Sequence, residues 1–361
     1  MSSGECLGPR PDGTELVRAG DLTTPALLAD AGVLDANMAT MSAARPGPAL
    51  RPHAKAFKCT ALAARLAAAG HAGFCCATVR ELEGLAASGL GEDLLLANEV
   101  VDRRALARLG ALVNAGTARV TVAIDSAETI AAAAGGGVRE VIVDVDVGMP
   151  RCGCDPSNAG RLADEARAAG LVVRGVMGYE GHAQHVVDRT EREARTVQAM
   201  SVLVGAHADV GGDVVSGGGT GTWDCNHVVT ELQAGSFVLM DGDYARLDLP
   251  FKEGLVLLTT AVSVRSGRHA ALDGGLKALA MDSGDPRLVD DFGGVATVQF
   301  CSDEHTTVAG GSWSVGDRVG LRPAHIDPTI SNHELLHLVD DAEAGGDAEV
   351  FESWPVDLRG W

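Results

Sequence analysis

Aromatic side chains and positive charge are both scarce in this sequence of 361 residues. Phe, Trp and Tyr make up only 4% of it, so Ala, Val, Leu and Gly must fill the core of a chain whose 46% hydrophobic content is that of a globular protein. Lys and Arg number 29 against 49 Asp and Glu, which gives a formal net charge of -20. Because this charge repels phosphate backbones and anionic lipids, we expect no nucleic acid and no membrane as a partner, and any bound phosphate must be held locally.

Long apolar runs are also missing. No stretch approaches the roughly 18 apolar residues of a membrane span, and the first twenty residues lack the apolar segment of a signal peptide. We therefore expect a cytoplasmic protein. The eight cysteines are too sparse for a secreted disulfide scaffold, so we expect them to be reduced and mostly buried.

What the sequence does contain is a regular alternation of short β-rich runs and Ala- and Leu-rich helical stretches over residues 25–247. Repeated β-helix-β units require a parallel sheet. The sequence has nine candidate strands, one more than the eight of an α/β fold of the (β/α)8 TIM-barrel type. We expect the run at 25–30 to lie outside the barrel. The run 50–57 would then be the first barrel strand and 213–219 the seventh, and the last candidate, 236–241, would follow as the eighth. An open doubly wound sheet is the alternative.

The C-terminal third of the chain has a different pattern. Residues 248–361 form alternating segments separated by Gly and Asp turns, without long helices. This pattern is typical of an antiparallel β domain. We expect this second domain to include the N-terminal segment, about residues 1–24.

The segment RPHAKAFKC, residues 51–59, carries two lysines where the first barrel strand ends. Active sites of TIM barrels are built at the carboxyl ends of the strands. On a strand, His53 and Lys55 would share one face and Lys58 the other. A solvated surface lysine is the ordinary interpretation of such a residue. Because both faces of a barrel strand are covered, however, at least one of the two should be partly buried and able to form a Schiff base.

A glycine-rich loop, SGGGTGT at 216–222, follows the predicted seventh strand. Its backbone N–H groups and its threonines suit an anion, although a tight loop without a ligand is the simpler interpretation. Its position favours binding, because the loops after strands 7 and 8 are the recurrent phosphate site of TIM barrels. Arg151, in VDVGMPRCG, ends another strand and could hydrogen-bond a cofactor ring. A reactive lysine and a phosphate site together predict pyridoxal 5'-phosphate.

These motifs, with ELQAGSFVLMD and DGGLKALAMDSG, resemble the fold-type III pyridoxal phosphate enzymes over nearly the whole chain. Within that class the sequence is similar to the D-threonine aldolase and D-serine dehydratase family, whose N-terminal barrel is like that of alanine racemase. The resemblance implies that Lys55 is the Schiff-base residue and that His53 and Arg51 shape its surroundings. The remaining cofactor contacts implied are Arg151, Tyr179, Ser216, Gly218, Gly219 and Thr220.

The stretch RPAHIDPT, residues 322–329, predicts a metal site. His325 and Asp327 alternate on one face of a predicted strand, and mixed N and O donors suit Mn2+, with Mg2+ and Zn2+ as alternatives. An ordinary hydrogen-bonded His–Asp pair is the simpler interpretation. The resemblance favours the metal, because the aldolases have H-x-D-P-T at their metal site whereas eukaryotic D-serine dehydratases have H-x-C and bind zinc.

The catalytic base is less clear, because GYEGHAQH at 178–185 departs from the aldolase pattern Y-H-G followed by A-Q-H. Alignment on A-Q-H puts Glu180 where the aldolases have a candidate catalytic histidine. Either Glu180 takes that role or His182 reaches the same place. His185 either shares in the chemistry or only orients its neighbours.

The resemblance implies a lyase that converts D-3-hydroxy amino acids, such as D-threonine, to glycine and an aldehyde. The alternative is a dehydratase that gives a 2-oxo acid and ammonia. A cofactor carrier without catalysis is disfavoured because such barrels lack a second domain. The resemblance further implies a homodimer, and it makes His305 in CSDEHTT a residue that could line the site.

Overall fold

The computed structural model describes residues 17–360. They divide into two compact units, and the division falls inside helix α1 (Ala31–Ala44). Of the described residues, one unit contains 37–238, 243–251 and 356–360, and the other contains 17–36, 239–242 and 252–355. Residues 1–16, most of the N-terminal segment predicted to join the second domain, lie outside the described residues. Seven of the cysteines lie in the described part, all are free, and five of these are buried.

The first unit is a parallel β-barrel. Its strands follow one another in the order β2-β3-β4-β5-β6-β7-β8, each parallel to the next. Their bounds are β2 (Gly73–Cys76), β3 (Asp93–Leu96), β4 (Val120–Ile124), β5 (Glu140–Asp144), β6 (Val172–Gly178), β7 (Val214–Gly217) and β8 (Glu231–Leu232). The segment 50–53 occupies the place of the first strand, because it makes parallel bridges from Leu50 to Leu232 and from His53 to Cys75. The fold class predicted from the sequence is therefore confirmed.

The predicted first strand, 50–57, is nevertheless mostly irregular. Pro52 has no N–H to donate, and pairing is limited to a few bonds such as Arg51 N–H to the Leu232 carbonyl at 2.9 Å. The chain then turns into a 3-10 helix at Ala54–Ala56, so His53 and Lys55 do not share a strand face as predicted. The candidate strand at 236–241 is wrong too: residues Ser236–Val238 form a 3-10 helix, and β8 supplies the eighth strand.

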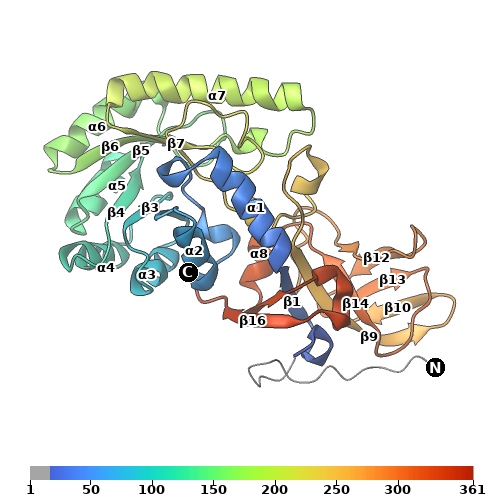
Figure 1. The fold of residues 1–361 in the computed structure, drawn as a ribbon. Helices are drawn as coiled ribbons and strands as arrows, with labels where there is room; N and C mark the ends of the chain where they lie inside the picture. Colours follow the sequence, from blue (N-terminus) through green and yellow to red (C-terminus); the bar gives the residue numbers. More distant parts are fainter. Residues whose placement is uncertain (1–16, 361) are drawn as a thin grey trace. The chain divides into compact units, whose positions relative to one another are not determined.

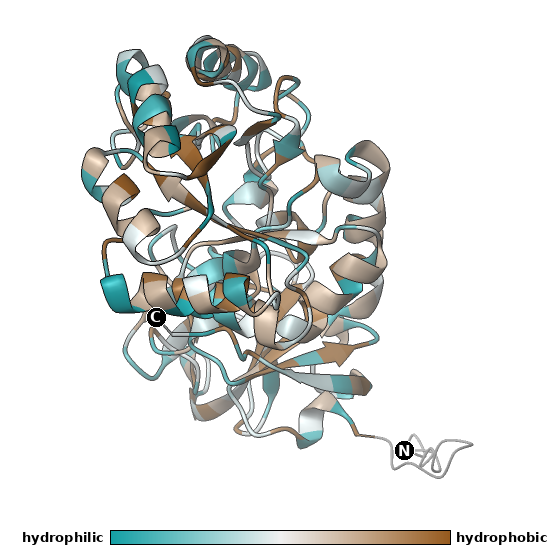
Figure 2. Ribbon diagram, turned by 90° about the vertical axis from the view of Figure 1, so that its left-hand side faces the viewer, coloured by the Kyte–Doolittle hydropathy of each residue, from teal (hydrophilic) through white to brown (hydrophobic). Residues whose placement is uncertain are grey.

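Helices surround the barrel strands in Figure 1. They are α2 (Thr60–Ala68), α3 (Val79–Ala87), α4 (Arg103–Asn114), α5 (Ala127–Gly135), α6 (Ala159–Ala168) and α7 (Arg189–Val210). Several begin where the sequence supplies a cap, as at Thr78, whose side chain accepts a hydrogen bond from the Glu81 amide. Figure 2 shows hydrophobic strands inside a ring of helices that mix hydrophilic and hydrophobic residues, as expected of strands covered on both faces.

A network of ion pairs joins residues at the amino ends of the barrel strands. Arg51 is 4% exposed and its guanidinium pairs with Glu231 and Asp93, each at 2.7 Å. Arg174 pairs with Asp93 at 2.6 Å and approaches Glu140 at 3.6 Å. Hydrogen bonds from the two guanidinium groups lower the pKa of Asp93 to about 2, although burial alone would raise it. Arg51 is therefore engaged in this network and does not line the cavity described below.

The second unit is a nine-stranded sheet with the path β12-β13-β10-β9-β1-β15-β16, to which β14 and β11 are added through β9. It is mixed rather than purely antiparallel, because β1 runs parallel to β15. The bounds are β1 (Ala26–Asp30), β9 (Leu255–Arg265), β10 (His269–Leu272), β11 (Arg287–Leu288), β12 (Thr297–Cys301), β13 (Thr306–Ala309), β14 (Arg318–Arg322), α8 (Ile326–Ser331), β15 (Leu335–Val339) and β16 (Val350–Pro355). The run at 25–30 thus pairs in this sheet and not in the barrel, as the strand count indicated.

Candidate active site

A cavity of about 250 Å³ lies at the carboxyl ends of the barrel strands. Its lining comes from the segments that follow the strands: His53 and Lys55 after the first, Asn98 and Glu99 after β3, Asp144 at the end of β5, Arg151 and Cys152 beyond it, Tyr179 after β6, Gly218, Gly219 and Thr220 after β7, and Gln233, Gly235 and Ser236 after β8. This is the end of a TIM barrel at which active sites are found. Seven of the residues predicted as site residues therefore meet in one cavity: Lys55, His53, Arg151, Tyr179, Gly218, Gly219 and Thr220.

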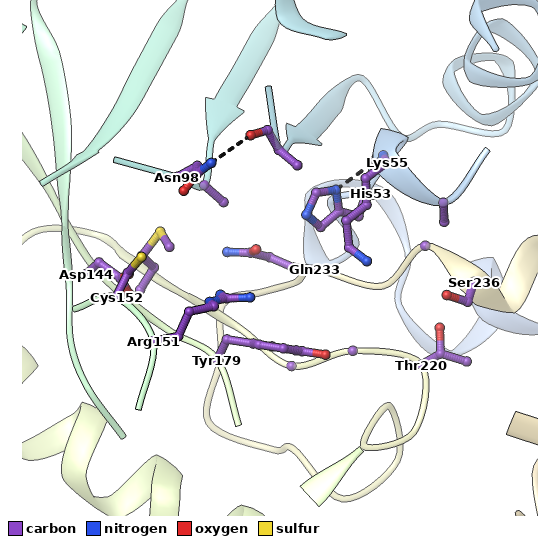
Figure 3. Close-up of a pocket in the computed structure, with 18 of the residues that line it drawn as sticks. His53, Lys55, Asn98, Asp144, Arg151, Cys152, Tyr179, Thr220, Gln233 and Ser236 are labelled. Carbon is purple, nitrogen blue, oxygen red and sulfur yellow. Dashed lines mark hydrogen bonds between the residues drawn. The ribbon is translucent and has the colours of Figure 1, made fainter. Parts of the chain in front are cut away.

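The two lysines of the opening motif have different surroundings. Lys55 is half-buried and lines the cavity (Figure 3). Lys58 has a left-handed backbone conformation, φ 45°, and its ammonium pairs with the fully buried carboxylate of Glu81. Glu81 also accepts a hydrogen bond from the Ala77 amide at 2.6 Å, so this ion pair fixes the start of α3. Of the two lysines, only Lys55 is placed to meet a ligand in the cavity.

Thr220 and Ser236 lie together at one end of the cavity (Figure 3). The Thr220 hydroxyl accepts a hydrogen bond from the Phe237 amide at 3.0 Å, which ties the loop after β7 to the 3-10 helix after β8. Hydroxyl and amide groups at this end suit an anion. Ser216, also predicted to contact the cofactor, is buried beneath: its hydroxyl accepts a hydrogen bond from Gln233 Nε2 at 2.8 Å.

The opposite end of the cavity is acidic. Burial and the neighbouring charge of Glu99 raise the pKa of Asp144 well above its usual range. Both Glu99 carboxylate oxygens are buried and have no hydrogen-bond partner within residues 17–360. Because its pKa is raised, Asp144 favours its neutral, protonated form, which lowers the negative charge at this end of the cavity. Burial and Glu99 also raise the pKa of Cys152 to about 11, which keeps its thiol neutral.

Arg151 is the cation beside this acidic pair. Its guanidinium carbon lies 5.4 Å from the centre of the Tyr179 ring, within the range of a cation–π contact. Arg151 and Tyr179 both border the cavity, on the side facing Gln233 (Figure 3). This side of the cavity therefore offers a fixed positive charge and a phenol ring to a bound molecule.

The three candidates for the catalytic base differ in position. Glu180 is fully buried, and its carboxylate accepts hydrogen bonds from the loop after β7. His182 is exposed, its imidazole lies against Gly148, and it is not part of the cavity lining.

His185 is the third; like His182, it is exposed and is not itself part of the cavity lining. Its Nδ1 lies 3.0 Å from a carboxylate oxygen of Asp243. Its ring centre is 4.5 Å from that of Tyr244, which lines the cavity. A histidine oriented by a carboxylate is the usual arrangement of a general base.

The predicted metal ligands lie in the second unit, but not on a strand. β14 ends at Arg322, His325 is the N-cap of α8, and Asp327 lies in its first turn. His325 Nδ1 is 2.7 Å from a carboxylate oxygen of Asp282. Within residues 17–360, no group of three or more His, Cys, Asp or Glu side chains is arranged to hold a metal. His305 is exposed in the turn between β12 and β13 and does not line the cavity.

Several residues in or next to the cavity were not predicted from the sequence. Gln233 lies within the quoted motif ELQAGSFVLMD, yet only the structure shows that its amide lies between Ser216 and Cys75, with the Cys75 thiol 3.2 Å from Oε1. Asp243 and Tyr244 follow the predicted last strand, where the sequence shows no motif. Pairs such as Asp243 and His185, 58 positions apart, can be found only from the fold or from an alignment.

Comparisons with known proteins agree with this geometry. Residues 29–241 match the family described as "Alanine racemase, N-terminal domain", and residues 254–339 match "Putative serine dehydratase domain". D-threonine aldolase of Arthrobacter sp is 34% identical over 98% of this chain and 96% of its own, and 3-hydroxy-D-aspartate aldolase of Paracoccus denitrificans (strain Pd 1222) is 31% identical over 94% and 93%. The crystal structure of D-threonine aldolase from Filomicrobium marinum superposes with a TM-score of 0.87 at 35% identity, covering 96% of this chain and 99% of that one.

These relatives share both parts of the chain, and not the barrel alone. No helix of residues 17–360 has the length and apolar character needed to cross a membrane. The chain belongs to the D-threonine aldolase and D-serine dehydratase family of enzymes, with an alanine racemase-like N-terminal domain.

Proposed function

We propose that this enzyme is a carbon–carbon lyase that depends on pyridoxal 5'-phosphate and a divalent metal. It would cleave D-3-hydroxy amino acids such as D-threonine to glycine and an aldehyde, or form them from these two compounds. The observation that carries the proposal is that Lys55 shares one cavity with the hydroxyl groups of Thr220 and Ser236. A primary amine and an anion site in the same cavity are what a phosphorylated aldehyde requires.

The cavity residues fit this cofactor by their chemistry. Lys55 would bond its aldehyde carbon, Thr220 and Ser236 would hold its phosphate beside Gly218 and Gly219, and Arg151, Tyr179 and His53 would border its ring. When bound, the cofactor withdraws electrons from the Cα atom of an amino acid and so weakens the bonds at that carbon. The protein's own part is to orient the amino acid and to move protons at its β-hydroxyl and at Cα.

We further propose His185 as the group that removes the β-hydroxyl proton, which breaks the Cα–Cβ bond. Asp243 would hold the imidazole in place and stabilise its charged form after proton transfer. His182 is the alternative indicated by the sequence. His185→Asn should lower kcat by about 100-fold or more, the usual contribution of a general base, whereas His182→Asn should change it little. The reverse result would move the role to His182.

A divalent metal is part of the proposal, and His325 and Asp327 are the residues that would hold it. Their N and O donors fit Mn2+ best, before Mg2+ and Zn2+. When bound, such an ion would lower the pKa of a coordinated hydroxyl group. His325 would have to exchange its hydrogen bond with Asp282 for the metal or use Nε2.

The second candidate is a D-serine or D-3-hydroxy amino acid dehydratase, favoured by the dehydratase description of the family matched by residues 254–339. In that reaction Lys55 would take the Cα proton and the hydroxyl group would leave. The two reactions differ in their products, glycine and an aldehyde against a 2-oxo acid and ammonia. Mass spectrometry of the products separates them.

The cofactor assignment has its own test. Borohydride reduction of the protein loaded with pyridoxal phosphate, followed by peptide mapping, should place the pyridoxyl group on Lys55. Modification of another lysine, or of none, would contradict the proposal. Light scattering tests the homodimer that the resemblance implies, and a monomer at working concentration would argue against it.

A further inference from the structure

Glu180 has its whole carboxylate engaged beneath the glycine-rich loop. The residue is 0% exposed. Its Oε2 accepts a hydrogen bond from the Gly218 amide at 3.2 Å, and its Oε1 accepts from the Thr222 hydroxyl at 2.8 Å and from Asn226 Nδ2 at 3.1 Å. Charge-assisted hydrogen bonds of this kind are about twice as strong as neutral ones. Glu180 therefore holds the loop at Gly218 and Thr222, and the chain just beyond the loop at Asn226.

Gln184, one turn further along the chain, completes this support. It is also 0% exposed, its Oε1 accepts a hydrogen bond from the Gly221 amide at 2.9 Å, and its Nε2 donates to the Thr222 hydroxyl at 2.9 Å. The Gly219 amide donates to the same hydroxyl oxygen at 3.3 Å. A Cβ atom on Gly219 would lie 2.6 Å from Gln184 Oε1, so the loop packs directly on this side chain.

The loop amides therefore do not act as the sequence suggested. Those of Gly218, Gly219 and Gly221 donate to Glu180, Thr222 and Gln184, and so point away from the cavity. The groups left to face a phosphate at this end belong to Thr220, Gly235 and Ser236. Their arrangement depends on the shape of the loop, which the buried carboxylate and amide beneath it determine.

We propose that Glu180 is a positioning residue that holds the Gly218–Thr222 loop in the shape that binds the cofactor phosphate, and that it takes no proton from the substrate. This inference rests on the proposed function, because it assigns a role toward the same cofactor. A proton acceptor must come within hydrogen-bond reach of its donor. Both oxygens of Glu180 are already engaged by the loop, and the residue is not part of the cavity lining.

The Glu180→Gln variant distinguishes the support that Glu180 gives to the loop from the effect of its negative charge. Glutamine keeps only one acceptor oxygen, so its NH2 group would face a donor, either the Gly218 amide or Asn226 Nδ2, and at least one of these contacts is lost. Removal of the negative charge acts in the opposite direction, because it reduces repulsion of a phosphate dianion. Weaker binding of the phosphate ester by this variant would therefore report the lost support of the loop and not the change in charge.

The test compares pyridoxal phosphate with pyridoxal, which lacks the phosphate, in absorbance titrations of the cofactor-free protein. Glu180→Gln should weaken pyridoxal phosphate binding by about tenfold or more, the effect expected when a hydrogen bond to a charged group is lost, and leave pyridoxal binding within about twofold. Thr222→Val should behave alike, and the double variant should be less affected than the sum of the two, because both act through one cluster. Glu193→Gln, on the exposed face of α7, is the matched control and should bind both ligands like the unaltered protein.

Equal affinity of Glu180→Gln and the unaltered protein for pyridoxal phosphate would overturn the inference. Loss of turnover at unchanged affinity would restore Glu180 as a proton acceptor. Circular dichroism and the melting temperature establish that each variant is folded, and Thr222→Val decides the question if Glu180→Gln does not fold. An unaltered protein that binds no pyridoxal phosphate would contradict the proposed function instead, so the two failures are distinguishable.

Discussion

Replacement of Lys58 by methionine should destabilise the barrel while leaving the cofactor in place. Lys58 and Glu81 form an ion pair whose side chains are 13% and 0% exposed. Methionine keeps most of the side-chain length, but it leaves the Glu81 carboxylate buried without a cation. Loss of one partner of a buried ion pair costs about 3–5 kcal/mol. For a unit of this size, such a loss corresponds to a melting temperature lowered by about 10 °C.

The assay for this prediction is thermal unfolding followed by circular dichroism, with cofactor absorbance recorded on the same samples. The double variant Lys58→Met/Glu81→Gln should recover most of the lost stability, because a neutral amide oxygen can still accept the hydrogen bond from Ala77. Lys55→Met is the matched change at the neighbouring lysine and should show the opposite pattern, with stability retained and the bound-cofactor absorbance lost. Loss of the cofactor in Lys58→Met but not in Lys55→Met would refute the assignment of the two lysines.

Two further predictions concern pH and metal. The folded-state pKa of Asp93, about 2, lies below its unfolded value, so its ion pairs with Arg51 and Arg174 stabilise the protein above about pH 4, and that contribution is lost as the pH falls toward 2. The melting temperatures of the unaltered protein and Asp93→Asn should therefore differ at neutral pH and converge in acid, and a constant difference would contradict this. His325→Ala should lower metal-stimulated turnover by at least about tenfold with unchanged cofactor absorbance. Equal turnover of the unaltered protein with and without a chelator would show that the reaction needs no metal.

The barrel could be predicted from the sequence because its helices and strands are specified locally. Alternating apolar runs and Ala-rich segments bounded by glycine identify β2 to β7 and most helices. The first strand was predicted in the right place, but it is shorter and less regular than expected because it contains Pro52. The eighth strand was predicted at 236–241, whereas β8 is only two residues long and lies at Glu231–Leu232. Their pairing depends on closure of the barrel, which no local pattern encodes.

The candidate site was predictable in its motifs but not in its contacts. Lys55 stands out because a lysine is unusual at the end of a buried strand, and the 216–222 loop stands out because it is rich in glycine and follows a strand. The roles of Glu180 and His185 depend on which side chains they meet, Thr222 and Asp243 among them, 42 and 58 positions away. Likewise, the strand predicted for His325 is the start of a helix, because β14 ends at Arg322, before His325 is reached.

The most direct test of the proposed function is incubation of the purified protein with pyridoxal phosphate, Mn2+ and D-threonine, with and without a chelator, and identification of the products. We predict glycine and acetaldehyde from the D-enantiomer, with the reaction lost when the chelator is present. Formation of 2-oxobutanoate and ammonia would instead assign the protein to the dehydratases, and no turnover of any D-3-hydroxy amino acid would contradict the account.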